Sequence, residues 1–131
     1  MRAYDARMGR VVHFELPADD VERASAFYRE VFGWALTPMP DMNYTIIATT
    51  ETDEQGRPTE PGAINGGMAA RGTPITAPII TLEVDDVDEA LAAVEKAGGR
   101  TVQSRAAVGD MGFTAYFADT EGTVVGLWQN A

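Results

Sequence analysis

The chain has 131 residues, of which 45% are hydrophobic and 23% charged, and this length and composition are typical of one folded domain, not of a disordered polypeptide. Acidic residues outnumber basic ones by 20 to 10, and the net charge of −10 opposes binding to phosphate backbones and anionic lipids, so we expect no nucleic acid and no membrane partner. The chain has no cysteine, which excludes disulfides and thiol nucleophiles, and without a long apolar run or a signal-peptide pattern we expect a cytoplasmic location.

The first half of the chain predicts a strand followed by a helix. Residues 11–16 alternate between apolar and mixed side chains, the pattern of a half-buried strand. Asp19 or Asp20 is expected to cap the helix, and Glu22 stands three residues after Asp19, as in a capping box. Gly33 is expected to end this helix, since glycine tolerates the left-handed conformation found there. The apolar stripe of the helix comprises Val21, Ala24, Phe27, Tyr28 and Val31.

The second half repeats this order. Residues 79–84 predict a strand, and Asp85 or Asp86 is expected to cap the following helix. The pair Gly98 and Gly99 is expected to end it. The apolar stripe of this second helix comprises Val87, Ala90, Leu91 and Val94.

Further β-rich runs follow each predicted helix. They cover residues 44–50 and 63–68 in the first half, and 101–104, 113–118 and 123–129 in the second. Residues 51–61 carry charge, glycine and proline without apolar periodicity, which predicts an exposed loop. Residues 71–78 contain Gly72, Pro74 and Pro78 and are expected to form a linker.

The two halves also resemble one another in sequence. Residues 11–16 are echoed by 79–84, and the acidic stretch that opens each predicted helix is shared. Residues 62–68 have a weaker counterpart in 122–128. Only two copies are present, so the repeat indicates a duplicated module in the order β-α-β-β-β and not a solenoid.

Three stretches carry a resemblance to a known superfamily: AFYREVFGW at 26–34, VDDVDEA at 84–90 and DTEG at 119–122. In this order and spacing the sequence resembles the vicinal oxygen chelate superfamily, the glyoxalase, bleomycin-resistance and extradiol-dioxygenase-like proteins. The resemblance implies an α+β fold with two tandem βαβββ modules curling around a cleft. It implies one domain over 1–131, with module one at about 10–70, the linker at 71–78 and module two at about 79–130. It also implies a homodimer.

Many members of that superfamily hold a divalent metal with a His near the start of each module and a Glu in its last strand. In this sequence the four equivalent positions fall on Val11, Ile79, Gly66 and Gly126. None of these side chains can bind a metal ion, because the usual protein ligands are imidazole, thiolate and carboxylate groups. We therefore expect neither a metal nor another cofactor.

Strand periodicity predicts which residues face a ligand. Val12, Phe14, Leu16, Ile80, Leu82 and Val84 are expected to lie under the helices, which leaves Val11, His13, Glu15, Ile79, Thr81 and Glu83 on the opposite face. A face with glutamate at the same place in both repeats is expected to be solvated, because a buried unpaired carboxylate is strongly disfavoured. The candidate ligand-binding residues are His13, Glu15, Thr81, Glu83, Tyr116 and Trp128.

Alternatives stay open for each of these residues. His13, the only histidine, either joins Glu15 and Glu83 in a metal-binding cluster or is a neutral polar residue. In the second case its hydrogen-bond partner is expected to be Glu15, Thr81 or Tyr116. The two glutamates are alternatively solvated or paired with arginines, namely Arg10, Arg71 or Arg105. Tyr116 and Trp128 are alternatively core or dimer contacts.

Three functions follow from these alternatives. The first is a metal-free, resistance-protein-like binder of a small cationic or aromatic molecule, which the acidity of the chain would attract. The second is a lyase, epimerase or dioxygenase of the glyoxalase type, with a displaced divalent metal or with an acid/base pair that includes His13. The third is a regulatory or structural module that keeps the fold for association alone.

Overall fold

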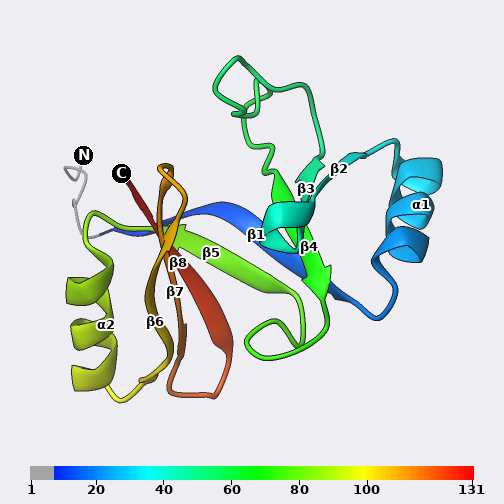
Figure 1. Ribbon diagram of the computed structural model, residues 1–131. Helices are drawn as coiled ribbons and strands as arrows, with labels where there is room; N and C mark the ends of the chain where they lie inside the picture. Colours follow the sequence, from blue (N-terminus) through cyan, green and yellow to red (C-terminus); the bar gives the residue numbers. More distant parts are fainter. Residues whose placement is uncertain (1–7) are drawn as a thin grey trace. The chain divides into compact units, whose positions relative to one another are not determined.

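The chain divides into two units in the computed structural model, which describes residues 8–131. The N-terminal unit is His13–Ile79, and the C-terminal unit combines residues 8–12 with Ile80–Ala131. Each unit contains one helix and one group of strands (Figure 1). None of the helices in the described residues is long and apolar enough to cross a membrane.

The N-terminal unit has one helix and four strands. Its elements are β1 (Arg10–Ala18, whose first residues belong to the C-terminal unit), α1 (Val21–Phe32), β2 (Ala35–Met39), a 3-10 turn (Pro40–Met42), β3 (Tyr44–Ala48) and β4 (Gly66–Ala70). The strand order is β2-β3-β4-β1. β1 and β4 run parallel, whereas the other neighbours are antiparallel (Figure 1).

The C-terminal unit repeats the plan. Its elements are β5 (Ile79–Glu83), α2 (Val87–Lys96), β6 (Arg100–Val108), β7 (Gly112–Ala118) and β8 (Val124–Asn130). The strand order is β5-β8-β7-β6, and β5 runs parallel to β8. The predicted α+β class and the twofold order β-α-β-β-β are thus confirmed. The cleft stays a prediction.

The boundaries differ from the predicted ones at several strands. β2 had no predicted range, because it is a short edge strand containing Pro38, with Leu36 as its only buried residue. β1 continues through Ala18, so Pro17 and Ala18 belong to the strand and do not separate it from the helix. β4 begins at Gly66, three residues later than expected.

Aspartates cap both helices. Asp20 accepts a hydrogen bond from the backbone N–H of Arg23, and Asp86 accepts one from Glu89. Of the two candidates at each helix, the later one is therefore the cap. The capping box predicted from Asp19 is wrong, because its Glu22 lies two residues after the actual cap. Gly33 ends α1 with φ of 70°, as predicted.

The cap assignment predicts a difference between two neighbouring aspartates. Asp86→Ala should lower the free energy of unfolding by about 1 kcal/mol, because a backbone N–H of the first turn loses its partner. Asp85→Ala removes the same charge at an exposed position outside the helix and should change it by less than about 0.5 kcal/mol. Urea denaturation of the two variants measures both values. Equal losses would contradict the assignment.

Each helix covers one face of the sheet in its own unit. In the N-terminal unit Phe14 and Leu16 pack with α1 residues around a buried core of Ala18, Leu36, Ile47 and Met68. In the C-terminal unit Leu82 and Val84 pack around Val87, Leu91, Ala115 and Leu127. The periodicity prediction is confirmed for these strand residues. It is wrong for Ile80, which is 49% exposed. The opposite surface of each sheet is called the helix-free face below.

Candidate functional site

Three polar side chains meet on the helix-free face of the N-terminal unit. His13 and Glu15 both come from β1, two residues apart, and therefore point to the same side of the strand. Tyr44, from the start of β3, places its hydroxyl 2.8 Å from His13 Nε2 and 2.7 Å from Glu15 Oε2. The rings of His13 and Tyr44 are nearly parallel, with an interplanar angle of 17°. We call His13, Tyr44 and Glu15 the His13 triplet.

Gly67 allows Tyr44 to reach the triplet. β4 lies between β3 and β1, and Gly67 is the residue of β4 that pairs with Glu15. A Cβ atom at position 67 would lie 1.9 Å from the Tyr44 hydroxyl and 2.0 Å from the ring carbon that bears it. The phenol ring therefore crosses β4 directly over Gly67. Any larger residue there would occupy the same space as the ring.

The neighbouring Gly66 serves the opposite face. A Cβ at this position would lie 2.5 Å from the backbone carbonyl oxygen of Phe14 and 2.8 Å from its ring. Phe14 is paired with Gly66 and packs toward α1. The two glycines thus accommodate one aromatic ring on each side of β4.

The direction of the hydrogen bonds in the triplet follows from its chemistry. A tyrosine hydroxyl carries one proton, and here it donates that proton to the carboxylate of Glu15. The hydroxyl oxygen must then accept from His13, so Nε2 of the imidazole carries a proton. The result is a directed series from His13 through Tyr44 to Glu15.

Burial affects the protonation of His13. Glu15 is only 6% exposed and its carboxylate is hydrogen-bonded, as buried carboxylates must be. Burial lowers the pKa of His13 below its ordinary value of 6.5, and the nearby Glu15 raises this pKa in part. Desolvation is the larger effect, which favours a neutral imidazole at neutral pH.

The lowered pKa of His13 predicts how stability depends on pH. As the pH falls through 6.5, the unfolded chain takes up a proton on this histidine before the folded chain does, so the free energy of unfolding decreases. His13→Gln lacks this titration. We expect wild type to lose more stability than His13→Gln between about pH 7.5 and about pH 5.5 in urea denaturation. A wild type that gains stability relative to the variant over this range would indicate a raised pKa and contradict the assignment.

The C-terminal unit carries its own polar residues on its helix-free face. Thr81 and Tyr116 flank Gly126 in one row across β5, β8 and β7, and both are 6% exposed. A Cβ at Gly126 would lie 2.8 Å from the Thr81 hydroxyl oxygen, so this glycine makes room for the threonine. Glu83 and Trp128 pair in the row two residues further along.

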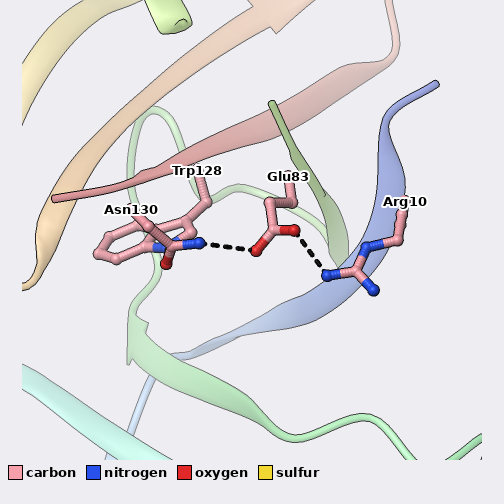
Figure 2. Close-up of polar contacts among 4 residues, drawn as sticks. All are labelled: Arg10, Glu83, Trp128 and Asn130. Atoms are coloured by element: carbon pink, nitrogen blue, oxygen red, sulfur yellow. Dashed lines mark hydrogen bonds and ion pairs between the residues drawn. The ribbon is translucent and has the colours of Figure 1, made fainter. Parts of the chain in front are cut away.

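A network of polar contacts orients Glu83 and Trp128 (Figure 2). The indole N–H of Trp128 donates to Asn130 Oδ1 at 2.8 Å, and the Asn130 amide donates to Glu83 Oε1 at 3.0 Å. Arg10 forms an ion pair with the other carboxylate oxygen at 2.6 Å. Arg10 is 62% exposed and Glu83 27%, so solvent weakens this pair. In both units, a glutamate of the first strand is thus held by a network that includes an aromatic residue.

Two hollows of the N-terminal unit lie beside other residues. One, of about 410 Å³, is lined by Asp19, Asp20, Arg23 and Arg71 among others, and these charges already pair as Arg71–Asp19 and Arg23–Asp20. The other, of about 270 Å³, is mainly apolar and includes Tyr44 but neither His13 nor Glu15. The charges of the first hollow thus pair with one another, and neither hollow is lined by His13 or Glu15.

Comparison with known proteins identifies the family. A family model described as bleomycin resistance protein-like N-terminal matches residues 10–50. A glyoxylase-like domain-containing protein of Didymella fabae is 32% identical over 119 residues, a match that covers 87% of this chain and 88% of that protein. The chain belongs to the vicinal oxygen chelate superfamily.

Other relatives of this vicinal oxygen chelate protein are longer or more distant. The anthracycline biosynthesis protein DnrV of Streptomyces peucetius is 28% identical over 135 residues, which cover 92% of this chain and 47% of DnrV. The chain spans about half the length of several curated relatives that it matches. The crystal structure of methylmalonyl-CoA epimerase from Mycobacterium tuberculosis has the same fold, with a TM-score of 0.63 at 17% identity, covering 100% of this chain and 93% of that one.

Neither unit of this vicinal oxygen chelate protein gathers a set of metal-ligating side chains among its described residues. Within residues 8–131, no group of three or more His, Cys, Asp or Glu side chains is arranged to hold a metal ion. The proposed cluster of His13, Glu15 and Glu83 draws on both units and stays a prediction. Of the two glycines assigned to family ligand positions, Gly126 lies against the Thr81 hydroxyl on the helix-free face. Gly66 instead lies against Phe14 on the α1 side, so its assignment to a ligand position of the helix-free face is wrong.

Other site predictions need correction. The partner of His13 is Tyr44, not Glu15, Thr81 or Tyr116. Glu15 is buried and bonded to a hydroxyl, so the expectation of a solvated carboxylate is wrong there. For Glu83 the predicted alternative of pairing with Arg10 is confirmed. The other two arginines pair elsewhere, as Arg71–Asp19 and Arg105–Asp88.

Proposed function

We propose that this chain binds a small molecule on its helix-free faces without a metal ion. One observation carries the proposal: the N-terminal face holds an oriented, partnered histidine whose second ring nitrogen makes no hydrogen bond within residues 8–131. Small-molecule sites combine a few oriented polar groups with aromatic surface. His13, Glu15 and Tyr44 supply them on one face, and Thr81, Glu83, Tyr116 and Trp128 on the other.

The charge of the chain favours a cationic or aromatic ligand. The net charge is −10, and each helix-free face carries a glutamate on its first strand. A negative potential raises the local concentration of cations and favours their binding.

From the family resemblance we also infer one domain over 1–131, with modules at about 10–70 and 79–130 joined by 71–78, and a homodimer. Analytical ultracentrifugation tests the dimer.

Benzylammonium is a suitable first probe, because it is both cationic and aromatic. We expect calorimetry to show weaker binding for Glu15→Gln and Glu83→Gln, each of which keeps an acceptor oxygen while removing a charge. Glu30→Gln removes the same charge from an exposed position on α1 and is the matched control. Equal affinities in all four proteins would refute the electrostatic part of the proposal. If neither benzylammonium nor a wider set of cationic and aromatic compounds binds, the binding function itself fails.

Acid/base catalysis at His13 is a second candidate function. The specific observation in its favour is the directed series of hydrogen bonds, because Tyr44 and Glu15 stabilise a proton on Nε2 while Nδ1 offers a lone pair. A base in this position would remove an acidic C–H proton of a carbonyl compound. Incorporation of solvent deuterium into methylmalonyl-CoA, lost in His13→Gln, would favour this candidate. Binding without exchange would favour the first.

Elemental analysis separates both candidates from a metal enzyme. Protein purified without chelator or metal-affinity tag should contain no stoichiometric manganese, iron, nickel or zinc, since no suitable group of ligands exists within residues 8–131. About one ion per chain that is lost in His13→Ala would show that the ligand mapping is wrong.

A further inference from the structure

We infer that the His13 triplet selects ligands that present a hydrogen-bond donor, because it fixes His13 as the Nε2–H tautomer and leaves Nδ1 as an acceptor. This inference rests on the proposed binding function and names the ligand class for that same face. An alcohol, a phenol, an amide N–H or an ammonium group belongs to this class. An ether, ester or carboxylate does not.

The tautomer follows from the number of protons in the triplet. A neutral imidazole has one N–H donor and one acceptor nitrogen. The Tyr44 hydroxyl gives its single proton to Glu15, so Nε2 must be the donor toward Tyr44. Nδ1 is then the acceptor. An inverted tautomer would set two lone pairs against each other at 2.8 Å.

The position of Nδ1 makes it available to a ligand. His13 makes only the Nε2 bond within residues 8–131. No buried side-chain nitrogen or oxygen atom in that part of the chain lacks a partner. Nδ1 therefore keeps some contact with solvent, and the inference requires a ligand donor to reach it from that side.

The backing residues make this acceptor specific. Glu15 is buried and receives the Tyr44 hydroxyl, so the carboxylate polarises the hydroxyl and, through it, the imidazole. The negative charge of Glu15 favours a hydrogen-bond donor or a cation at Nδ1 of His13. Gly67 leaves the space that the Tyr44 ring occupies over β4, so this arrangement depends on a residue without a side chain at position 67.

Phenol and anisole test the inference, because they differ in one O–H donor. Binding is followed by the ¹⁵N shifts of the imidazole, which are unambiguous because the chain has a single histidine. We expect phenol to bind about tenfold more tightly than anisole and to shift the Nδ1 resonance. Tyr44→Phe removes the hydroxyl that fixes the tautomer and should reduce this ratio toward one. Tyr28→Phe, the same change in the α1 core, is the matched control and should keep the ratio.

The outcomes separate the inference from the proposed function. Equal or tighter binding of anisole, or a ratio unchanged by Tyr44→Phe, would overturn the inference while leaving binding intact. Failure of both probes to shift any resonance of His13 would count against the proposed binding face. In that case the ¹⁵N spectrum of the free protein still decides the tautomer, and a protonated Nδ1 would overturn the inference.

Discussion

Gly67→Ala should expel the Tyr44 ring from the helix-free face and lower the free energy of unfolding by about 2–4 kcal/mol. The new Cβ would lie 1.9 Å from the hydroxyl, and the ring can escape only by rotating away. Its hydrogen bonds to His13 and Glu15 are then lost, one neutral and one to a carboxylate, and the buried Glu15 loses a donor. Urea denaturation measures the loss.

A double-mutant cycle shows whether Tyr44 is the cause. In a Tyr44→Ala background the ring atoms nearest to the new methyl group are absent, so Gly67→Ala should cost less than about 1 kcal/mol there. A cost as large as in the wild-type background would mean that the glycine is needed for another reason. The imidazole ¹⁵N shifts of Gly67→Ala should resemble those of Tyr44→Phe.

Gly66→Ala should destabilise the fold by about 3 kcal/mol through a different clash. Its Cβ would lie 2.5 Å from the carbonyl oxygen of Phe14, a main-chain atom of the paired strand that cannot rotate away. Replacing the Phe14 ring with the smaller leucine side chain in Phe14→Leu should therefore not restore the stability of Gly66→Ala. Because this clash lies on the α1 side, the imidazole ¹⁵N shifts of folded Gly66→Ala should remain those of wild type. Thermal and urea denaturation with the same spectra measure both effects.

Rescue of Gly66→Ala by Phe14→Leu would contradict this explanation. It would show that the ring and not the main chain limits position 66. Changed imidazole ¹⁵N shifts in Gly67→Ala together with unchanged shifts in Gly66→Ala would instead support the account of β4 as a strand that accommodates one ring on each face.

Much of the fold could be predicted from local periodicity. The alternation in 11–16 and 79–84 and the stripes of the two helices depend on neighbours within a few positions, which the sequence displays directly. β2 could not be predicted because an edge strand requires little apolar patterning, and it contains Pro38, a residue rare inside central strands. The exposure of Ile80 could not be predicted either, because alternation shows which side of the sheet a residue faces but not how much of that side the helix covers.

The centre of the site could be predicted only in part. His13 and Glu15 follow from parity on one strand, but their partner Tyr44 is brought in by the strand order β3-β4-β1, which no local pattern contains. The one sequence signal for it was the pair Gly66-Gly67, since adjacent glycines inside a strand indicate close approach on both faces. The sequence predicts a solvated Glu15 carboxylate because it does not reveal that the Tyr44 hydroxyl donates a hydrogen bond to it.

The ¹⁵N spectrum of the single histidine at neutral pH tests the central claim most directly. The account predicts a neutral imidazole with a protonated Nε2 and an unprotonated Nδ1, because Tyr44 accepts from the first and donates to Glu15. Averaged shifts typical of a freely exchanging imidazole, or a proton on Nδ1, would show that the His13 triplet does not exist as described.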